Sequence, residues 1–126
     1  MSLILDSGAL IALDKNERAM WTRVKASYLA GEVPLSHGGV VGQVWRGRGS
    51  RQALLARALA GIDVRPLDQH LGRAAGELLA AARRSDVIDA ALVLLAADGD
   101  SIITSDPNDL GPLARASGRQ VDIIRA

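Results

Sequence analysis

The stretch SLILDSGALIAL, residues 2–13, decides the fold class. Its first four residues form an apolar run suited to a buried strand, and Asp6 ends that run. The residues from Ser7 to Leu13 then favour a short helix that begins near Ser7. A strand followed by a helix is the repeating unit of a parallel α/β sheet.

Short apolar runs and helical segments alternate along the rest of the chain in the same way. The alternation predicts a parallel sheet with helices on both faces, in a single domain that covers residues 1–126. Predicted strands cover residues 2–6, 33–36, 62–67, 101–104 and 121–125, and the third has a proline that suits an edge strand. Predicted helices cover residues 7–13, 19–30, 40–45, 51–60, 71–82, 87–97 and 107–117. The helices on either side of the glycine-rich stretch 46–50 are expected to form an arm that stands off the sheet.

Three aspartates lie in or directly after segments that should be buried. Asp6 and Asp106 follow predicted strands, and Asp89 interrupts the apolar run VIDAALVLLA at residues 87–96. Because sites in open parallel sheets form at the carboxyl ends of the strands, we expect the three carboxylates to converge. A buried carboxylate must be neutralised, paired or bound to metal, and a cage of such oxygens suits Mg²⁺ or Mn²⁺. Without metal, mutual repulsion should raise the pKa of at least one of them.

The composition excludes several kinds of site. The chain has no Cys, so disulfides, zinc thiolates and a thiol nucleophile are excluded. It has no Phe, one Tyr and two Trp, too few rings for a surface that stacks on single-stranded nucleic acid. No signal peptide is visible, and the longest apolar run is interrupted by Asp89 and too short to span a bilayer. We therefore expect a cytoplasmic protein without membrane attachment.

The net charge of +1 conceals an uneven distribution of charged side chains. Residues 33–62 contain four arginines and no acid: Arg46, Arg48, Arg51 and Arg57. Residues 85–114 contain six aspartates and no Lys or Arg: Asp86, Asp89, Asp98, Asp100, Asp106 and Asp109. An enzyme that acts on a polyanion needs both kinds of surface, cation ligands at the reacting phosphate and arginines along the backbone.

Four segments, taken together, resemble the PIN-domain family, and within it the VapC-type ribonuclease toxins of type II toxin–antitoxin systems. They are ILDSGAL at 4–10, QVWRG at 43–47, DVIDA at 86–90 and TSDPNDL at 104–110. One such fragment alone is weak, but four in this order cover essentially the whole chain. The resemblance implies a three-layer α/β/α sandwich around a mainly parallel, roughly five-stranded sheet.

The resemblance also implies an activity, a cofactor and partners. It implies an endoribonuclease that uses Mg²⁺ or Mn²⁺ to hydrolyse RNA phosphodiester bonds, forms a homodimer and is inhibited by a VapB-like antitoxin. Asp6, Asp89 and Asp106 match three of the family's four acidic positions, as metal ligands and catalytic residues. Ser7 and Ser105 match the small polar neighbours of these acids.

The fourth acidic position departs from the family, which usually has Glu where this chain has Gln43. An amide oxygen can ligate Mg²⁺, but it has no charge and cannot act as a base. Glu32 is no obvious substitute, because it precedes the second strand and should lie at the opposite edge. The departure leaves open a one-metal site, a stronger preference for Mn²⁺, or an inactive relative that only binds. Another Mg²⁺-dependent α/β phosphohydrolase is a further alternative, although such enzymes need a late lysine and Lys15 and Lys25 are both early.

Helix capping offers a second interpretation of several acids. Aspartate is a favoured N-cap residue, so Asp6 and Asp106 could cap the helices that follow them. Asp86 is more typical of a cap than of a ligand, and Asp109 suits a helix start or an outer, weak ligand. Asp89 resists this interpretation, because aspartate within an apolar helix has poor propensity and a cost of burial.

Basic side chains near the glycine-rich stretch are expected to contact RNA phosphates. The candidates are Arg46, Arg48 and Arg51, and Arg46 could instead pair with a site acid or lie exposed. His37 follows the second strand near the site edge, where it could act as an acid or base or be purely structural.

Apolar side chains bear on the homodimer that the resemblance implies. An apolar surface for it is placed around Leu10, Leu13 and Trp21. Trp45 is a single aromatic residue suited to packing or to an interface rather than to a stacking track.

Overall fold

The centre of the molecule is a five-stranded parallel sheet with strand order β3-β2-β1-β4-β5, in a computed structural model that describes residues 1–47 and 51–126. The elements in chain order are β1 (Leu3–Leu5), α1 (Ser7–Asp14), α2 (Arg18–Leu29), β2 (Leu35–His37), α3 (Gly38–Val44), α4 (Ala53–Ala60), β3 (Asp63–Arg65), α5 (Gln69–Ala82), α6 (Val87–Leu95), β4 (Ser101–Thr104), α7 (Pro107–Ser117) and β5 (Asp122–Arg125). The predicted parallel sheet is confirmed.

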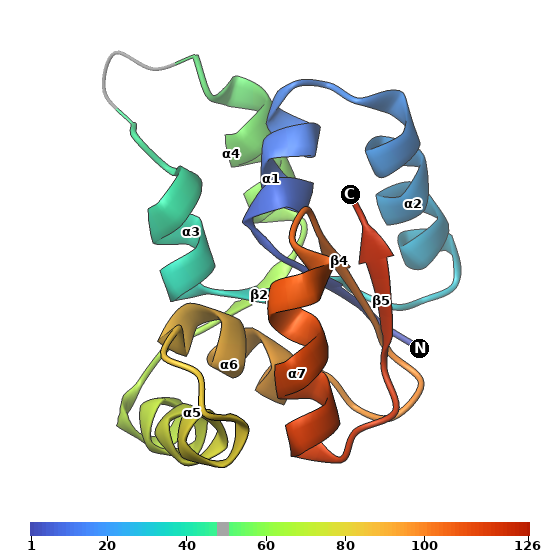
Figure 1. Cartoon of the computed structure of the whole chain (residues 1–126). Coiled ribbons are helices and arrows are strands. Elements are labelled where there is room, and N and C mark those ends of the chain that lie inside the picture. The colour runs from blue at the N-terminus through green and yellow to red at the C-terminus, as the bar shows by residue number, and fades with distance from the viewer. Residues whose placement is uncertain (48–50) are drawn as a thin grey trace.

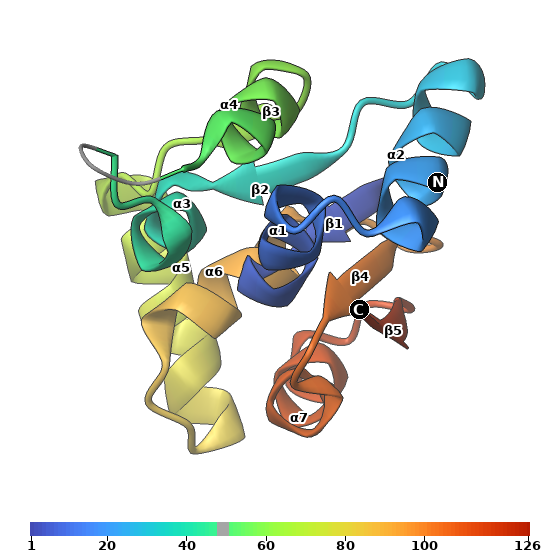
Figure 2. The same ribbon diagram turned by 90° about the horizontal axis from the view of Figure 1, so that it is seen from above.

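Helices cover both faces of the sheet, as the alternation of segments predicts. Figure 1 shows α1, α2 and α4 on one face and α5, α6 and α7 on the other. Seen from above in Figure 2, the strands follow one another from β2 through β1 and β4 to β5. The three-layer α/β/α architecture expected from the resemblance is therefore confirmed. Among the helices of residues 1–47 and 51–126, none is both long and apolar enough to cross a membrane.

The two central strands form the middle of the core. Ile4 of β1 and Ile102 and Ile103 of β4 are fully buried, as expected for parallel strands that are covered on both faces. Leu10 and Leu13 of α1 are also fully buried, and they were wrongly placed on a dimer surface. Their helix lies against the sheet, so these side chains fill the core and are not available to a partner.

The helices on either side of the glycine-rich stretch, α3 and α4, pack against another helix. Both α3 and α4 contact α1, and Leu55 and Ala58 of α4 are buried there. The backbone N–H of Leu55 also donates to Asp14 Oδ1 at 3.3 Å. The predicted arm is thus wrong, because the apolar face of α4 needs cover and finds it on α1.

The second strand begins later than predicted and ends one residue later. It spans Leu35–His37 rather than residues 33–36. Pro34 has no N–H for the ladder, although its carbonyl accepts from the N–H of Asp63 at 2.8 Å. The predicted edge position of the third strand is confirmed, since β3 is the first strand of the sheet.

The order of the strands reverses direction between β1 and β4, and this reversal positions the site. From β1 the chain proceeds outward to β2 and β3, then crosses back to β4 on the other side of β1 and continues to β5. In open α/β sheets, ligands bind in the crevice outside the carboxyl ends of the strands at such a reversal. Leu5 is in register with Ile103, so Asp6 and Thr104 follow side by side at that edge.

Candidate active site

Asp6 ends the central strand β1, and two hydrogen bonds fix its carboxylate. The side chain is buried, with 5% of its surface exposed. Its Oδ1 accepts from the backbone N–H of Ser7 at 2.7 Å, and its Oδ2 accepts from Thr104 Oγ1 at 2.6 Å. Asp6 is therefore the N-cap of α1, as capping predicted, and it also lies at the carboxyl edge of the sheet. Because each carboxylate oxygen has two lone pairs, both oxygens keep capacity for another ligand.

Thr104 connects the two strand-end aspartates and was not predicted as a site residue. Its hydroxyl donates to Asp6 Oδ2 and accepts from the backbone N–H of Asp106 at 3.0 Å. Thr104 is fully buried at the last position of β4. Its signal in the sequence is a hydroxyl at the end of an apolar strand, two residues before a predicted ligand.

Gly8 allows the start of α1 to touch the turn between β4 and α7. A Cβ at this position would lie 2.5 Å from Ser105 Oγ and 2.9 Å from the Ser105 backbone nitrogen. Figure 1 shows the start of α1 next to the start of α7, in agreement with this contact. The lack of a side chain at Gly8 therefore allows the residues after Asp6 to lie close to the residues before Asp106.

Asp89 lies in the first turn of α6 and has the most perturbed carboxyl group of the site. Burial, the largest cause, and nearby negative charges together raise its pKa to about 7. In order of effect, these charges are those of Asp86, Asp6, Asp109 and Asp106. The expected rise in the pKa of one clustered acid is thus confirmed, and its main cause is loss of hydration rather than repulsion alone.

Asp86 is the N-cap of α6, as predicted. Its Oδ1 accepts from the backbone N–H of Asp89 at 3.1 Å. The side chain is exposed, which leaves its charge free to act on Asp89.

Asp106 and Asp109 lie at the start of α7, which packs against α6. Asp106 occupies the N-cap position but makes no capping hydrogen bond with its side chain. Asp109 lies in the first turn of α7 and raises the pKa of Asp89 more than Asp106 does. Asp109 was expected to be a helix start or an outer ligand, and its position in the first turn of α7 confirms the helix start.

Two surface hollows meet at Asp109. The first, which we call the Asp89 hollow, has a volume of about 200 Å³ and is lined by Arg84, Ser85, Asp86, Asp89, Asp109 and Leu113. The second, the Asp106 hollow, has a volume of about 230 Å³ and is lined by Ser105, Asp106, Pro107, Asn108, Asp109 and Arg125. Each hollow contains one arginine, and neither arginine was predicted as a site residue.

The donor chemistry of these acids fits a divalent metal ion in kind and in charge. Carboxylate oxygens are the preferred ligands of Mg²⁺ and Mn²⁺, and the charges that contribute to the raised pKa of Asp89 are all negative. Within residues 1–47 and 51–126, however, no three His, Cys, Asp or Glu side chains already form a metal-binding group. The acids therefore surround a common region without closing on one point.

Gln43 and Glu32 are the two residues that bear on the missing fourth acid. Gln43 is exposed on α3, and its side-chain amide makes no hydrogen bond within the described parts of the chain. Glu32 accepts from the amino group of Met1 at 2.8 Å, next to the start of β1. Glu32 thus lies at the opposite edge of the sheet from Asp6, as predicted, and cannot replace Gln43.

Arg46 holds the end of α3, and among the described residues it pairs with no acid. Its Nη1 donates to the carbonyl oxygens of Trp45 at 2.8 Å and Gly42 at 3.3 Å, and its Nη2 donates to that of Gln43 at 3.1 Å. The guanidinium therefore caps carbonyls at the end of the helix. Arg51 is exposed, and Arg48 lies outside the described residues.

His37 holds two elements together, and this fits the structural one of the two roles expected for it. It is fully buried, its Nδ1 accepts from the Gly39 N–H at 3.1 Å, and its Nε2 lies 2.9 Å from the carbonyl oxygen of Ile88. These partners assign the proton to Nε2, and burial lowers the pKa so that the ring is neutral. The ring thus ties the end of β2 to the first turn of α6, directly before Asp89.

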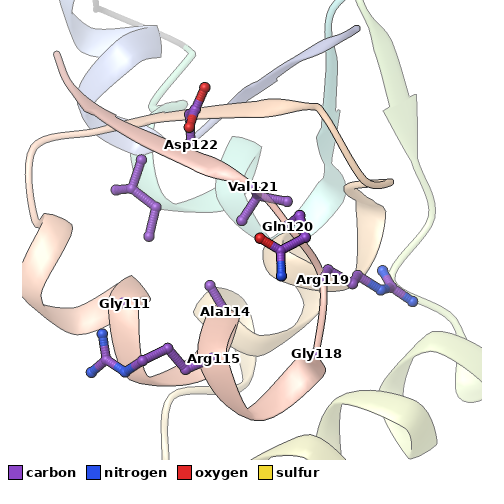
Figure 3. A pocket seen from close by; sticks show the side chains of 9 residues that line it. Gly111, Ala114, Arg115, Gly118, Arg119, Gln120, Val121 and Asp122 are labelled. Carbon is purple, nitrogen blue, oxygen red and sulfur yellow. The ribbon is translucent and has the colours of Figure 1, made fainter.

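A larger hollow, with a volume of about 480 Å³, lies between α7 and β5, and Figure 3 shows its lining. It adjoins the last turns of α7 at Ala114, Arg115 and Gly118, whereas the acids adjoin the first turn of that helix. Arg119 points out of it and donates to the carbonyl oxygens of Leu94 at 2.6 Å and Ala96 at 2.9 Å. This larger hollow is therefore not one of the two hollows that the acids of the candidate site line.

Comparison with known proteins gives a match of structure without a match of sequence. No protein-family model matches the chain, and no curated protein matches it by sequence. A chain in the crystal structure of VapBC2 from Rickettsia felis, bound to a DNA fragment from their promoter, matches with a TM-score of 0.71. The match covers 98% of both chains at 11% sequence identity. Together with the sheet order, it shows that this chain has a PIN-like α/β fold.

Proposed function

We propose that the protein is a Mg²⁺- or Mn²⁺-dependent endoribonuclease and the toxin component of a VapBC-type toxin–antitoxin module. The observation that carries the proposal is Asp89, a half-buried acid with a pKa of about 7 that faces four other aspartates. A cluster of this kind at the strand-order reversal attracts a divalent cation, and a cation bound to acids is a general means of phosphodiester hydrolysis.

In this proposal Asp6, Asp89 and Asp106 hold the cation, with Asp109 as a further ligand from the same side. Asp6 is held in place by the Ser7 N–H and the Thr104 hydroxyl, so little of its freedom remains to be lost on binding. When bound, the cation supplies positive charge at the phosphate and makes a water molecule more acidic. Asp86 stays at the cap of α6 and keeps the turn that carries Asp89 in position.

Asp89 also sets the pH at which the site becomes competent. With a pKa of about 7, its carboxyl group is close to half protonated at neutral pH in the absence of a cation. It must release that proton before both of its oxygens serve as ligands. We therefore expect cation binding and proton release to be coupled at Asp89.

The proposed partners are RNA as substrate, a VapB-like antitoxin and a second copy of the chain, in the cytoplasm. The similar protein from Rickettsia felis was crystallised as a VapBC2 assembly on promoter DNA, which supports the antitoxin as the first partner to test. Coexpression with the product of an adjacent gene tests this part of the proposal. A partner that copurifies and abolishes RNA cleavage supports it, and cleavage that is unchanged in such a complex contradicts it.

The second candidate is a PIN-like protein that binds without turnover, and Gln43 and the open arrangement of the acids favour it. Gln43→Glu distinguishes the two, since a large gain in cleavage would identify a weakened site. The further alternative, a different α/β phosphohydrolase, is less well supported. Such an enzyme would need its lysine on a late strand. Here Lys15 is exposed directly after α1, and Lys25 is exposed within α2.

The decisive experiment is cleavage of total RNA by the purified protein with Mg²⁺, with Mn²⁺ and with chelator. Asp89→Asn should abolish the cleavage, and Asp122→Asn is the matched control because Asp122 is exposed at the start of β5. Metal-dependent cleavage that is lost only in Asp89→Asn supports the proposal. Absence of cleavage from folded protein, freed of any partner, overturns the enzymatic part.

A further inference from the structure

Two arginines line the hollows of the acidic region. Arg84 lines the Asp89 hollow and Arg125 lines the Asp106 hollow. Both hollows include Asp109, so each of the two arginines shares a hollow with this acidic residue. Both arginines come from segments that the charge distribution of the sequence did not single out.

The fold brings Arg84 to this place at the junction of two helices. α5 ends at Ala82, and Arg83 adopts a left-handed conformation with φ of 56°. The N–H of Arg84 then donates back to the carbonyl oxygen of Leu79 at 3.0 Å. This turn reverses the chain towards Asp86, the cap of α6, and presents Arg84 beside Asp89.

Arg125 reaches the site from the edge strand β5. It is in register with Thr104, the residue whose hydroxyl holds Asp6. Its Nη1 donates to the carbonyl oxygen of Ser105 at 3.1 Å. One N–H of the guanidinium thus fixes its position, and the remaining donors make no hydrogen bond to the described parts of the chain.

Neither guanidinium is neutralised by the acids around it. In residues 1–47 and 51–126, the ion pairs within 4.0 Å are those of the Met1 amino group with Glu32 and of Arg65 with Asp63. The charges that act on the carboxyl group of Asp89 are all acidic. Arg46 and Arg119, by contrast, are engaged with the carbonyl groups at helix ends.

We propose that Arg84 and Arg125 bind the phosphates on the two sides of the cleaved bond, so that the RNA strand crosses the first turns of α6 and α7. This inference rests on the proposed ribonuclease function and names the path of its substrate. An acidic site repels a polyanion, and contacts from guanidinium groups to the flanking phosphates offset that repulsion. The strand therefore runs over Asp89 and Asp109 rather than over the α3–α4 loop.

Binding of a labelled, mixed-sequence single-stranded RNA to Asp89→Asn protein tests the path without cleavage. Arg84→Gln and Arg125→Gln should each weaken binding on the order of tenfold and lower the salt slope by about 0.7, the value for one contact with a single strand. Arg84→Lys and Arg125→Lys should restore the salt slope, because they keep the charge. Arg115→Gln, on the same helix α7 at its far end, is the matched control and should change neither quantity.

In the cleaving protein, the same Arg→Gln changes should raise KM about tenfold and change kcat by less than about twofold. Thermal unfolding of every variant checks that the fold is retained. Equal binding by Arg84→Gln, Arg125→Gln and Arg115→Gln overturns the path but leaves a cleaving enzyme intact. A loss confined to Arg46→Gln moves the path to the α3–α4 side and also overturns it. Folded protein that neither binds nor cleaves RNA overturns both the path and the ribonuclease proposal.

Discussion

Acidic side chains at the two edges of the sheet have opposite surroundings. At the amino edge, Asp100 is buried with 8% of its surface exposed, and backbone N–H groups satisfy both of its oxygens. Ser2 donates to Oδ1 at 2.7 Å and Ala97 donates to Oδ2 at 2.8 Å. At the carboxyl edge, Asp89 is half-buried, faces other acids and has a pKa of about 7.

This difference separates acids that the fold itself stabilises from acids that it leaves with an unbalanced charge. A carboxylate that accepts hydrogen bonds from backbone N–H groups is stabilised in its place by the fold. A carboxylate whose neighbours are also acids is left with a charge that only an added cation or proton can offset. Asp6 combines both states, since it accepts two hydrogen bonds and still acts on Asp89.

The largest expected effect contrasts the two edges directly. Asp6→Asn should lower RNA cleavage by roughly 100-fold, because it removes a proposed cation ligand at the centre of the site. Asp100→Asn should leave the cleavage rate per folded molecule unchanged and lower the free energy of unfolding by about 1–3 kcal/mol, because the amide turns an N–H towards a backbone donor. Cleavage rates and urea unfolding of both variants measure this. Equal loss of cleavage in both would show that the two edges do not differ in function.

A second contrast concerns the close contact that closes the carboxyl edge. Gly8→Ala should destabilise the protein by about 1–3 kcal/mol, because the added Cβ meets Ser105 and forces α1 away from the turn before α7. Gly76→Ala is the matched control, since Gly76 is exposed on α5 with nothing within 4 Å of an added Cβ. It should stabilise the protein by about 0.5–1 kcal/mol through helix propensity. Unfolding midpoints that move in the same direction would contradict the contact.

The third prediction concerns the proton on Asp89 and its competition with a cation. Affinity for Mn²⁺ should fall about tenfold for each pH unit below 7, because one proton must leave before the cation binds. Calorimetric titrations with Mn²⁺ at pH 5.5, 6.5 and 7.5 measure this. An affinity that is independent of pH across this window would remove Asp89 from the ligand set.

The smallest expected effect is on stability in the absence of cations. The pKa of Asp89 is about 7 in the folded protein against 3.8 for the ordinary group, so between these values the folded state holds a proton that the unfolded state releases. This bound proton therefore stabilises the folded state fully below pH 4, and the stabilisation is lost as the pH rises to about 7. Asp89→Asn has no carboxyl group to ionise, so it does not lose stability in this way. Its free energy of unfolding at pH 8 should exceed that of the parent chain by on the order of 1 kcal/mol, after allowance for solvent screening. At pH 4 the two proteins should differ little. Urea unfolding with chelator at both pH values measures the difference, and a less stable variant at pH 8 would have the wrong sign.

The elements were predictable where local pattern and tertiary packing agree. β4 and α7 begin and end where the apolar run 101–104, Pro107 and Gly118 indicate, because strand propensity, a helix-starting proline and a terminating glycine are local signals. The surface placed around Leu10 and Leu13 failed, because both faces of a central parallel sheet must be covered and α1 supplies that cover.

The acids of the candidate site could be predicted from the sequence, but the residues that hold them in place or lie beside them could not. Asp6 and Asp89 were identifiable because a charged side chain within an apolar run is conspicuous. Thr104 was not, since a buried hydroxyl looks like any strand residue until its partner across the sheet is known. Arg84 and Arg125 were missed because the path of the chain, and not the local charge balance, brings them to the acids.

The hydrogen bond between Thr104 and Asp6 joins residues 98 positions apart, and this separation has a consequence for synthesis on the ribosome. A nascent chain that has not yet released β4 contains Asp6 and Asp89 but has no strand to fill the place beside β1. Long-range parallel pairing of this kind also forms slowly compared with local helices. Asp6 can therefore be held in its final position only after translation has passed the fourth strand.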